Sequence, residues 1–425
     1  MVPLIMPIGA LLVGIALLLL GSGLLNTLLA LKSELEGYSG ATLGLIMSGY
    51  FIGFFVGTLL ALPLIRRVGH VRAFACCAAL VASSVLLHIL LVDPLAWLLI
   101  RILTGIALVI LYTVIESWLN GQTPADKRAR VFAIYMTVNL GALALAQQLL
   151  RFDTSISHLL FVLAAILVCL SVVPVTWTRL QQPEVHNVER LKLRQLWQTA
   201  PVAMAGSLLS GLAMGAFWGL GAAYATRVGL AVNDVAMFIS CGILGGAICQ
   251  FPLGRYSDSR DRRRVLALVS LAAALLALAV LWLSASTMLL FIAIAAYGGV
   301  AFAVYPLAVA HMVDHLQPQS MLAGGSALLL VHGIGAVLGP LLAGQFMQVL
   351  GANGLPLYWL VTQALLALFA FWSLRAGEAE DPAEHGAEFI AMVRTTPAAL
   401  EMLPQEESEP DAHGVWGGEH SGAGH

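Results

Sequence analysis

The sequence predicts an all-α integral membrane protein with twelve transmembrane helices. Of its 425 residues, 60% are hydrophobic and only 10% are charged, whereas soluble domains carry about 25% charged residues. The mean hydropathy is +0.89, and the apolar residues fall in runs of about 20, the length that crosses a bilayer as a helix. This composition excludes a soluble enzyme, a nucleic-acid-binding protein and a disordered chain, because a water-soluble fold cannot cover so much apolar surface.

Twelve apolar runs separated by polar loops define the expected helices. They lie near residues 5–30, 42–65, 73–92, 95–118, 130–150, 157–177, 200–226, 234–254, 264–284, 287–311, 321–349 and 355–375. No Lys or Arg precedes the first run, so we expect a first span rather than a cleaved signal peptide. The five cysteines lie in apolar stretches without metal-ligand spacing, so neither a metal nor another cofactor is expected.

The basic residues set the expected orientation. With both termini in the cytoplasm, 17 of the 21 Lys and Arg residues fall on the cytoplasmic side, which is the side that positive charge prefers. Only Lys32, Arg151 and Arg227 fall outside, and Arg101 falls within a span. We therefore expect a multi-pass protein of the cytoplasmic (inner) membrane.

Loop lengths divide the chain into four parts. Residues 1–178 and 200–375 each hold six expected helices, and the polar segment 179–199 joins them. Residues 376–425 hold 11 acidic residues and 1 basic residue, which is typical of a disordered tail. A weak internal repeat supports two pseudo-symmetric halves, since an offset of 192 aligns Ser48 with Ser240 and Gly53 with Gly245.

The strongest motif is GRYSDSRDRRR, residues 254–264. Gly254, Asp258 and the run Arg262, Arg263 and Arg264 resemble the signature loop of the major facilitator superfamily, G-x-x-x-D-R-x-G-R-R. The resemblance implies that Asp258 latches onto the fifth helix and holds the cytoplasmic side shut in the outward-facing state. An ordinary positively charged loop is the alternative.

The corresponding loop of the first half, residues 62–72, departs from this pattern. Gly69 and Arg72 fit, but Arg66 occupies the acidic position and Leu62 the first glycine position. A second latch onto the eleventh helix is therefore in doubt.

Charged residues in or near the spans form the next group of candidates. Arg101 and Gly105 resemble the R-x-x-x-G element of the superfamily; a buried arginine usually faces a cavity, although Arg101 could instead extend to the interface. Glu116, Arg128, Arg130 and Asp314 lie at span ends and are expected in a charge network. Proton handling by Glu116 is the alternative.

Cavity and packing residues complete the set. In the superfamily, helices one, four, seven and ten line the cavity, where the polar and aromatic candidates are Asn26, Arg101, Tyr112, Trp218 and Tyr305, with His332 on helix eleven. Each could instead face lipid or pack against a helix. Close packing along one side of helix eleven is expected at Gly335 and Gly339, and a bend is expected at Pro340. Gly105 is expected at a helix contact.

Together, these motifs and residues 114–136 and 303–310 resemble the poorly characterised YcaD-like branch of the major facilitator superfamily. The resemblance implies a secondary active transporter, acting as a monomer, that moves a small solute by alternating access with proton coupling. Catalytic motifs such as HExxH and GxSxG do not occur, so an enzyme is not expected. A non-transporting sensor or scaffold that acts through the acidic tail is the alternative function.

Overall fold

The computed structural model describes residues 2–177, 192–317 and 320–376, together with Phe389, Met392 and Thr396. Within these residues the chain is helical without strands. The long helices are α1 (Val2–Leu35), α2 (Gly40–Val68), α3 (His70–Leu90), α4 (Pro94–Gln122), α5 (Arg128–Gln148), α6 (His158–Trp177), α8 (Pro201–Arg227), α9 (Val232–Asp258), α10 (Arg262–Trp282), α11 (Thr287–Ala301), α12 (Val304–Val313), α13 (Met321–Leu350) and α14 (Gly354–Ala376). The short α7 (Leu193–Thr199) precedes α8; the rest of the expected linker, residues 179–191, lies outside the described residues.

The apolar helices confirm the predicted class of integral membrane protein. Eleven helical stretches of the described chain are long and apolar enough to cross a membrane, and the last, Met321–Arg375, contains both α13 and α14. Large apolar side chains such as Leu99, Ile248 and Leu368 are exposed on the outer faces of these helices. Such faces suit hydrocarbon rather than water.

The expected tenth span, 287–311, is broken in the structure. It consists of α11 and α12, with Phe302 and Ala303 in a turn between them. Pro306 lies in the first turn of α12, where it has no N–H to donate to the carbonyl of Phe302. Thr287–Val313 is still one stretch long and apolar enough to cross the membrane, so the predicted span is confirmed. The turn within it was not predicted, because hydropathy does not register one missing hydrogen bond.

Local sequence explains where the helices begin. The Ser39 hydroxyl accepts a hydrogen bond from the Thr42 amide, and the Asp93 carboxylate accepts from the amides of Leu95 and Ala96. These are N-cap interactions, which satisfy amides that have no partner within the helix. Gly69 joins α2 to α3 with φ of 82°, a conformation that side chains other than glycine rarely adopt.

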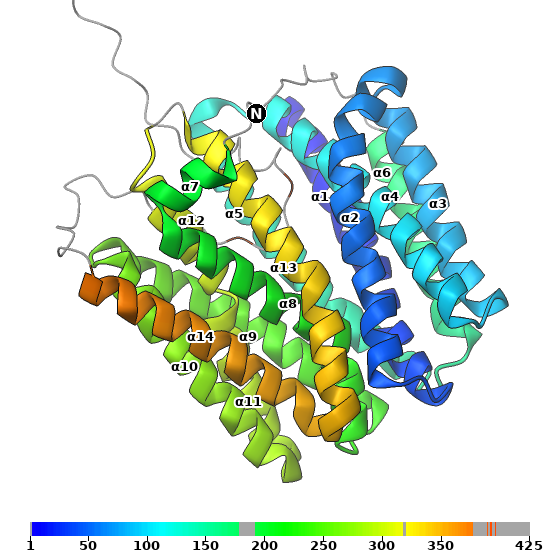
Figure 1. Cartoon of the computed structure of the whole chain (residues 1–425). Helices are drawn as coiled ribbons and strands as arrows, with labels where there is room; N and C mark the ends of the chain where they lie inside the picture. The colour runs from blue at the N-terminus through cyan, green and yellow to red at the C-terminus, as the bar shows by residue number, and fades with distance from the viewer. Residues whose placement is uncertain are drawn as a thin grey trace, which may run out of the picture.

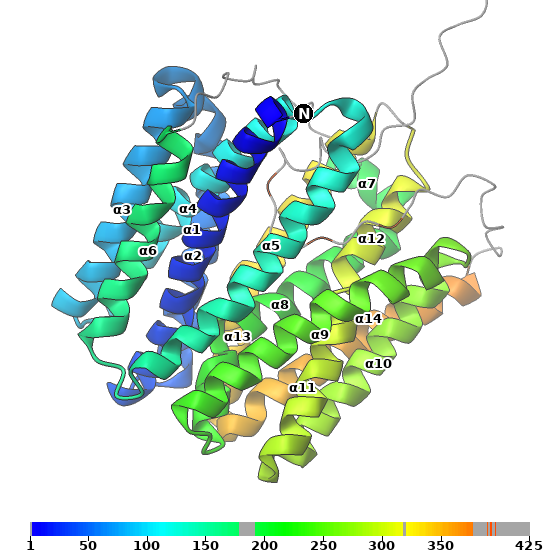
Figure 2. The ribbon, with the colours of Figure 1, turned by 180° about the vertical axis from the view of Figure 1, so that it is seen from behind.

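The helices form two groups, α1–α6 and α8–α14 (Figures 1 and 2). We call the end that holds the α2–α3, α4–α5 and α9–α10 junctions the basic end, because most loop arginines lie there. The chain also begins at this end (Figure 1). The α1–α2, α5–α6 and α8–α9 junctions lie at the other end, which we call the opposite end.

Glycine contacts show that the two groups repeat one another. A Cβ atom on Gly53 would lie 2.0 Å from the Ile102 carbonyl oxygen, so α2 and α4 cross with their backbones in contact. A Cβ atom on Gly245 would lie 1.9 Å from the Ala295 carbonyl oxygen, at the crossing of α9 and α11. Gly53 and Gly245 were aligned by the sequence repeat, and they occupy equivalent crossings of the two groups.

Candidate functional site

The two helix groups are hydrogen-bonded to each other at the opposite end. The Ser48 hydroxyl of α2 donates to the Val337 carbonyl oxygen of α13 at 2.7 Å. Its repeat partner Ser240 of α9 donates to the Ala144 carbonyl oxygen of α5 at 3.0 Å and accepts from the Gln148 amide at 2.7 Å. Equivalent serines therefore join each group to the other along two related interfaces, α2–α13 and α5–α9.

Close backbone contact tightens the α2–α13 interface. A Cβ atom on Gly44 would lie 2.3 Å from the Pro340 carbonyl oxygen, and one on Gly40 would lie 2.8 Å from the Gly344 carbonyl oxygen. Both distances are shorter than carbon–oxygen contact allows, so only glycine fits. Pro340 thus lies directly in the contact between the groups.

An ion pair adds a third connection at the opposite end. The Arg227 guanidinium of α8 lies 2.9 Å from the Glu34 carboxylate of α1, with both side chains about one-fifth exposed. A fork of two N–H groups on one carboxylate fixes the relative position of the two helices. The opposite end is therefore closed in this structure.

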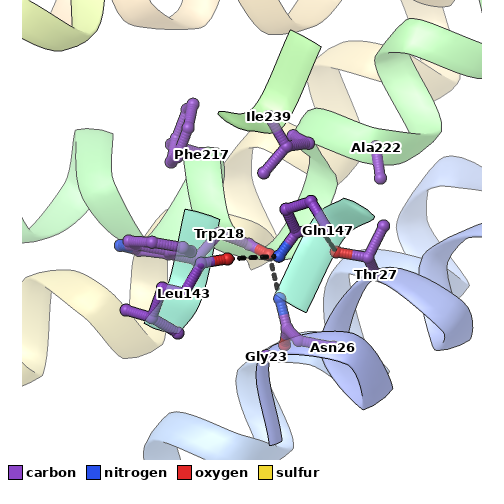
Figure 3. A pocket seen from close by; sticks show the side chains of 9 residues that line it. All are labelled: Gly23, Asn26, Thr27, Leu143, Gln147, Phe217, Trp218, Ala222 and Ile239. Atoms are coloured by element: carbon purple, nitrogen blue, oxygen red, sulfur yellow. Dashed lines mark hydrogen bonds between the residues drawn. The ribbon is translucent and has the colours of Figure 1, made fainter. Parts of the chain in front are cut away.

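A small pocket lies just inside this closed end (Figure 3). Four helices from both groups line it, and its residues are Gly23, Asn26, Thr27, Leu143, Gln147, Phe217, Trp218, Ala222 and Ile239. The Thr27 hydroxyl donates to the Gln147 side-chain oxygen at 2.6 Å. Neutral hydrogen-bonding groups and aromatic rings are the usual lining of a small-molecule site, but the free space here holds about one water molecule.

Arg101 is linked to this pocket through Asn26. The Arg101 side chain is 2% exposed, its guanidinium donates to Asn26 Oδ1 at 2.8 Å and lies 4.7 Å from the centre of the Tyr50 ring. Because arginine only donates, Oδ1 faces Arg101 and the Asn26 amide nitrogen faces the Trp218 carbonyl oxygen of the other group, to which it donates. Arg101 is thus buried rather than extended to the membrane interface, and it orients a side chain that joins the two groups.

The remaining cavity candidates lie apart from the pocket. Tyr305 and His332 form a pair within α8–α14, with ring centres 4.5 Å apart, and His332 Nδ1 lies 3.2 Å from the Ser207 carbonyl oxygen. Tyr112 is buried in α1–α6, with its ring centre 6.1 Å from that of Phe54. Of the six candidates, the structure brings together Asn26, Arg101 and Trp218.

The expected packing glycines lie at backbone contacts. Cβ atoms on Gly335 and Gly339 would lie 2.2 and 2.3 Å from the carbonyl oxygens of Leu208 and Leu212, so α13 and α8 are in close contact. A Cβ atom on Gly105 would lie 2.1 Å from the Tyr50 carbonyl oxygen at the α2–α4 crossing. None of the three positions has room for a larger residue.

At the basic end, the signature loop forms a charged cluster within α8–α14. Arg262 Nε lies 2.8 Å from Asp314, and Arg262 Nη2 lies 3.4 Å from Asp258. Arg263 pairs with Asp261, which caps α10, and Arg264 is exposed. Asp314 therefore belongs with the signature loop, in the other helix group from Glu116.

Glu116 of α4 lies at the basic end in the other helix group, α1–α6. Its side chain is fully buried and its carboxylate accepts a hydrogen bond from the Tyr135 hydroxyl at 2.8 Å. The second oxygen accepts from the Thr396 amide at 3.0 Å and from the Thr396 hydroxyl. The other expected members of this end, Arg130 and Arg72, are exposed at the surface, and Arg128 is half-buried.

Several contact residues were not among the sequence candidates. They are Glu34, Ser48, Gln147, Gln148, Arg227, Ser240 and Thr396. Two signals could have found some of them: Ser48 and Ser240 were aligned by the repeat, and two adjacent glutamines within an apolar span are costly unless they have partners. The pairing of Glu34 with Arg227 has no such signal.

Two pseudo-symmetric helix groups, spanning helices and a polar site between them define the class: a multi-pass membrane protein with a transporter fold. Among the described residues, no group of three His, Cys, Asp or Glu is placed to hold a metal ion. The family model of the Major Facilitator Superfamily matches residues 11–328 and 203–405. The chain belongs to that superfamily.

Similar proteins agree with this assignment. The uncharacterized MFS-type transporter YcaD of Escherichia coli O6:K15:H31 (strain 536 / UPEC) is 29% identical over 387 residues, covering 89% of this chain and 98% of that protein. The uncharacterized MFS-type transporter Ent638_1421 of Enterobacter sp. (strain 638) is 29% identical over 388 residues, with the same coverage. The resemblance to the YcaD-like branch is therefore confirmed.

Solved structures share the fold at lower identity. The nucleoside transporter NupG has a TM-score of 0.73 at 16% identity, covering 88% of this chain and 100% of its own. A bacterial homologue of the human lysosomal transporter Spinster, in an inward-facing and occupied conformation, has a TM-score of 0.71 at 17% identity, covering 88% and 98%. At such identities the likeness concerns the fold alone.

Proposed function

We propose that this protein is a secondary active transporter that moves a small solute across the cytoplasmic membrane by alternating access. The supporting observation is the position of the contacts between the helix groups. Ser48, Ser240 and Arg227 join the groups at the opposite end, on related helix pairs. Two rigid groups joined at one end can rock about the site between them and exchange which end is closed.

The described conformation is then the state that is open toward the basic end. By the resemblance, Asp258 latches onto the start of α5 only when the basic end is closed. Here its carboxylate lies 3.4 Å from Arg262 and accepts from the Phe389 amide at 3.0 Å. Asp258 therefore bonds to Arg262 and Phe389 here, as expected of a released latch when the basic end is open.

The distribution of basic residues orients this cycle. The basic end would face the cytoplasm, with both termini on that side. The described structure is then inward-facing, and the closed end with Glu34 and Arg227 faces outward.

The pocket limits the substrate class. Asn26, Thr27 and Gln147 offer neutral hydrogen-bonding groups, and Trp218 and Phe217 offer aromatic faces. These groups suit a small amphipathic solute that is held by hydrogen bonds and ring contacts.

Proton coupling forms part of the proposal. Glu116 and His332 are the candidate carriers, because both are titratable and lie on helices that border the space between the groups. His332→Gln and Glu116→Gln would then reduce gradient-driven uptake while leaving substrate exchange intact.

Cysteine reporters test alternating access. Ser48→Cys and Ser240→Cys, each in a background without native cysteines, would react with a membrane-impermeant maleimide added outside only when the opposite end opens. Ser171→Cys is the control, because Ser171 is fully buried in α6 and bonds to its own helix at Val168.

Uptake of candidate solutes into vesicles, with and without a proton gradient, identifies the substrate and the driving force. A substrate should change the labelling rates of both reporters together. Reporters that never react, in a protein whose uptake does not respond to any gradient, would contradict the proposal.

A further inference from the structure

Asn26 is held in one orientation by its neighbours, and it lines the pocket of Figure 3. Asn26 Oδ1 accepts a hydrogen bond from Arg101, which can only donate, so the nitrogen Nδ2 donates to the Trp218 carbonyl oxygen of the other helix group. An amide nitrogen carries two hydrogens, and this bond uses one of them. Among the hydrogen bonds of the described residues, the second Asn26 N–H has no acceptor.

Gln147 is fixed in the same way by its own neighbours. Its nitrogen Nε2 donates at 3.2 Å to the Leu143 carbonyl oxygen, which can only accept, and its oxygen Oε1 accepts from the Thr27 hydroxyl at 2.6 Å. The Gln147 side chain is 1% exposed, and within the described part of the chain one of its N–H groups is also left without an acceptor. Two N–H donors, one from α1 and one from α5, therefore remain at one buried pocket.

The space beside these donors has the size of one oxygen atom. The pocket holds about one water molecule, and a terminal oxygen of a solute occupies a similar volume. Because a buried donor without an acceptor costs free energy, an acceptor in this space is stabilised by the amides that line it. Phe217 and Trp218 also line the pocket, and their aromatic faces suit the apolar body of such a solute.

Arg101 adds positive charge behind this pocket. Its side chain is 2% exposed, and its guanidinium donates to Asn26 Oδ1 at 2.8 Å. A hydrogen bond from a cation to the amide oxygen polarises the amide and strengthens its N–H donors. An ammonium group brings only donors and a charge of the same sign, so the pocket disfavours it. A carboxylate or carbonyl oxygen, which only accepts, fits both the donors and the charge.

We propose that this pocket is an oxygen-binding subsite, in which the amides of Asn26 and Gln147 hold a carboxylate or carbonyl oxygen of the transported solute. Arg101 is a positioning residue that keeps the Asn26 donor turned toward the other helix group. The inference rests on the proposed transport function and names its substrate class. That class is a small solute with an aromatic or apolar body and an oxygen acceptor at one end, and it excludes cationic amines.

Three compounds of similar shape test the subsite in the unaltered full-length protein. Phenylacetate, phenylacetamide and phenethylamine share a phenyl group and differ at the end that would enter the pocket. Isothermal titration in detergent should show phenylacetate binding about a hundredfold, and phenylacetamide about tenfold, more tightly than phenethylamine, because hydrogen bonds to a charged oxygen are the stronger ones. Phenethylamine binding as tightly as the other two, or no binding by any of the three, would show that the pocket holds a water molecule only.

A variant separates the loss of a donor from a change in the fold. Gln147→Met removes the N–H groups, keeps the length of the side chain and should lower the ratio of phenylacetate to phenethylamine affinity about tenfold. A purely structural change would lower both affinities alike and leave their ratio as it was, which would contradict the assignment of Gln147. Gln195→Met is the matched control, because Gln195 is exposed on α7 and does not line the pocket. If Gln147→Met does not fold, the three affinities of the unaltered protein still decide.

The cysteine reporters separate this inference from the proposed function. If Ser48→Cys and Ser240→Cys react as alternating access requires, while phenylacetate shows no preference over phenethylamine, the subsite is refuted and alternating access stands. If the reporters never react but the preference is present and depends on Gln147, the subsite stands and the transport proposal fails. Silent reporters together with no preference would refute both.

Discussion

A single methyl group at Gly44 should force the opposite end open. Gly44 of α2 faces the Pro340 carbonyl oxygen of α13, and an added Cβ atom would lie 2.3 Å from that oxygen. Real Cβ atoms essentially never approach within 3.0 Å, so the two helices would have to separate. The partner atom belongs to the backbone and cannot rotate away, as the end of a side chain could.

The size of the effect follows from the cost of overpacking. Inserting a methyl group into a well-packed contact costs about 1–3 kcal/mol, and every 1.4 kcal/mol changes an equilibrium constant about tenfold. The cost arises only while the opposite end is closed. Gly44→Ala should therefore shift the equilibrium toward the outward-open state by about five- to 140-fold.

The labelling rate of Ser240→Cys measures this shift. Ser240 lies on the α5–α9 interface, so a response there shows that the groups move as rigid bodies rather than that α2 bends locally. Gly141→Ala is the matched control, because a Cβ atom on Gly141 of α5 has no neighbour within 4 Å. Equal labelling rates in the Gly44→Ala and Gly141→Ala proteins would refute the idea that the α2–α13 contact closes the gate.

Three further predictions concern other polar contacts. Arg101→Met should destabilise the protein by about 1–3 kcal/mol, because the partly buried Asn26 oxygen loses the hydrogen bond that Arg101 donates; thermal unfolding in detergent measures the loss. Glu34→Gln should accelerate labelling of the reporters by about fivefold, since a partly exposed ion pair contributes about 1 kcal/mol. Hydrogen bonds from Ser155 and Ser157 lower the pKa of Asp153 to about 2, so carboxyl NMR should show Asp153 ionised from neutral pH down to about pH 3.

Two results would contradict the first two of these predictions. An Arg101→Met protein as stable as the parent would show that Arg101 does not support Asn26. Unchanged labelling in Glu34→Gln would show that the ion pair does not bias the gate.

For Asp153, the lowered pKa means that its stabilising effect is complete above the ordinary value of 3.8 and is lost as the pH falls through about 2. Replacing Ser155 and Ser157 with alanine should return the pKa toward 3.8. A pKa that stays near 2 in that double variant would show that these serines are not the cause.

Part of the candidate site could be predicted because its residues are unusual for the apolar spans in which they lie, or match a motif by their spacing. Arg101 stood out as a charge within an apolar span, and Asn26 and Trp218 as polar and aromatic groups on helices expected to line the cavity. Gly254 and Asp258 stood out through their spacing. Tyr305 and His332 were equally plausible by these criteria, yet they pair with each other away from the pocket, because sequence does not fix which way a helix is rotated.

The contacts between the halves could not be predicted in the same way. Glu34 and Arg227 are ordinary loop-end charges, separated by 193 residues. Their pairing depends on which end of the molecule is closed. Thr396 was hidden for a similar reason, since the acidic composition around it favours solvent and gives no sign of a buried carboxylate partner.

The sequence by itself determined that twelve apolar segments cross a membrane as helices, and that they fall into two related groups. Hydropathy, caps and the repeat suffice for this, because an isolated span must satisfy its own backbone hydrogen bonds. Only the tertiary structure decided that Ser48 and Ser240 join the groups, and that Phe389 and Thr396 return to the basic end. These depend on contacts between residues far apart in the chain, and such contacts exist only once the groups are packed in a particular conformation.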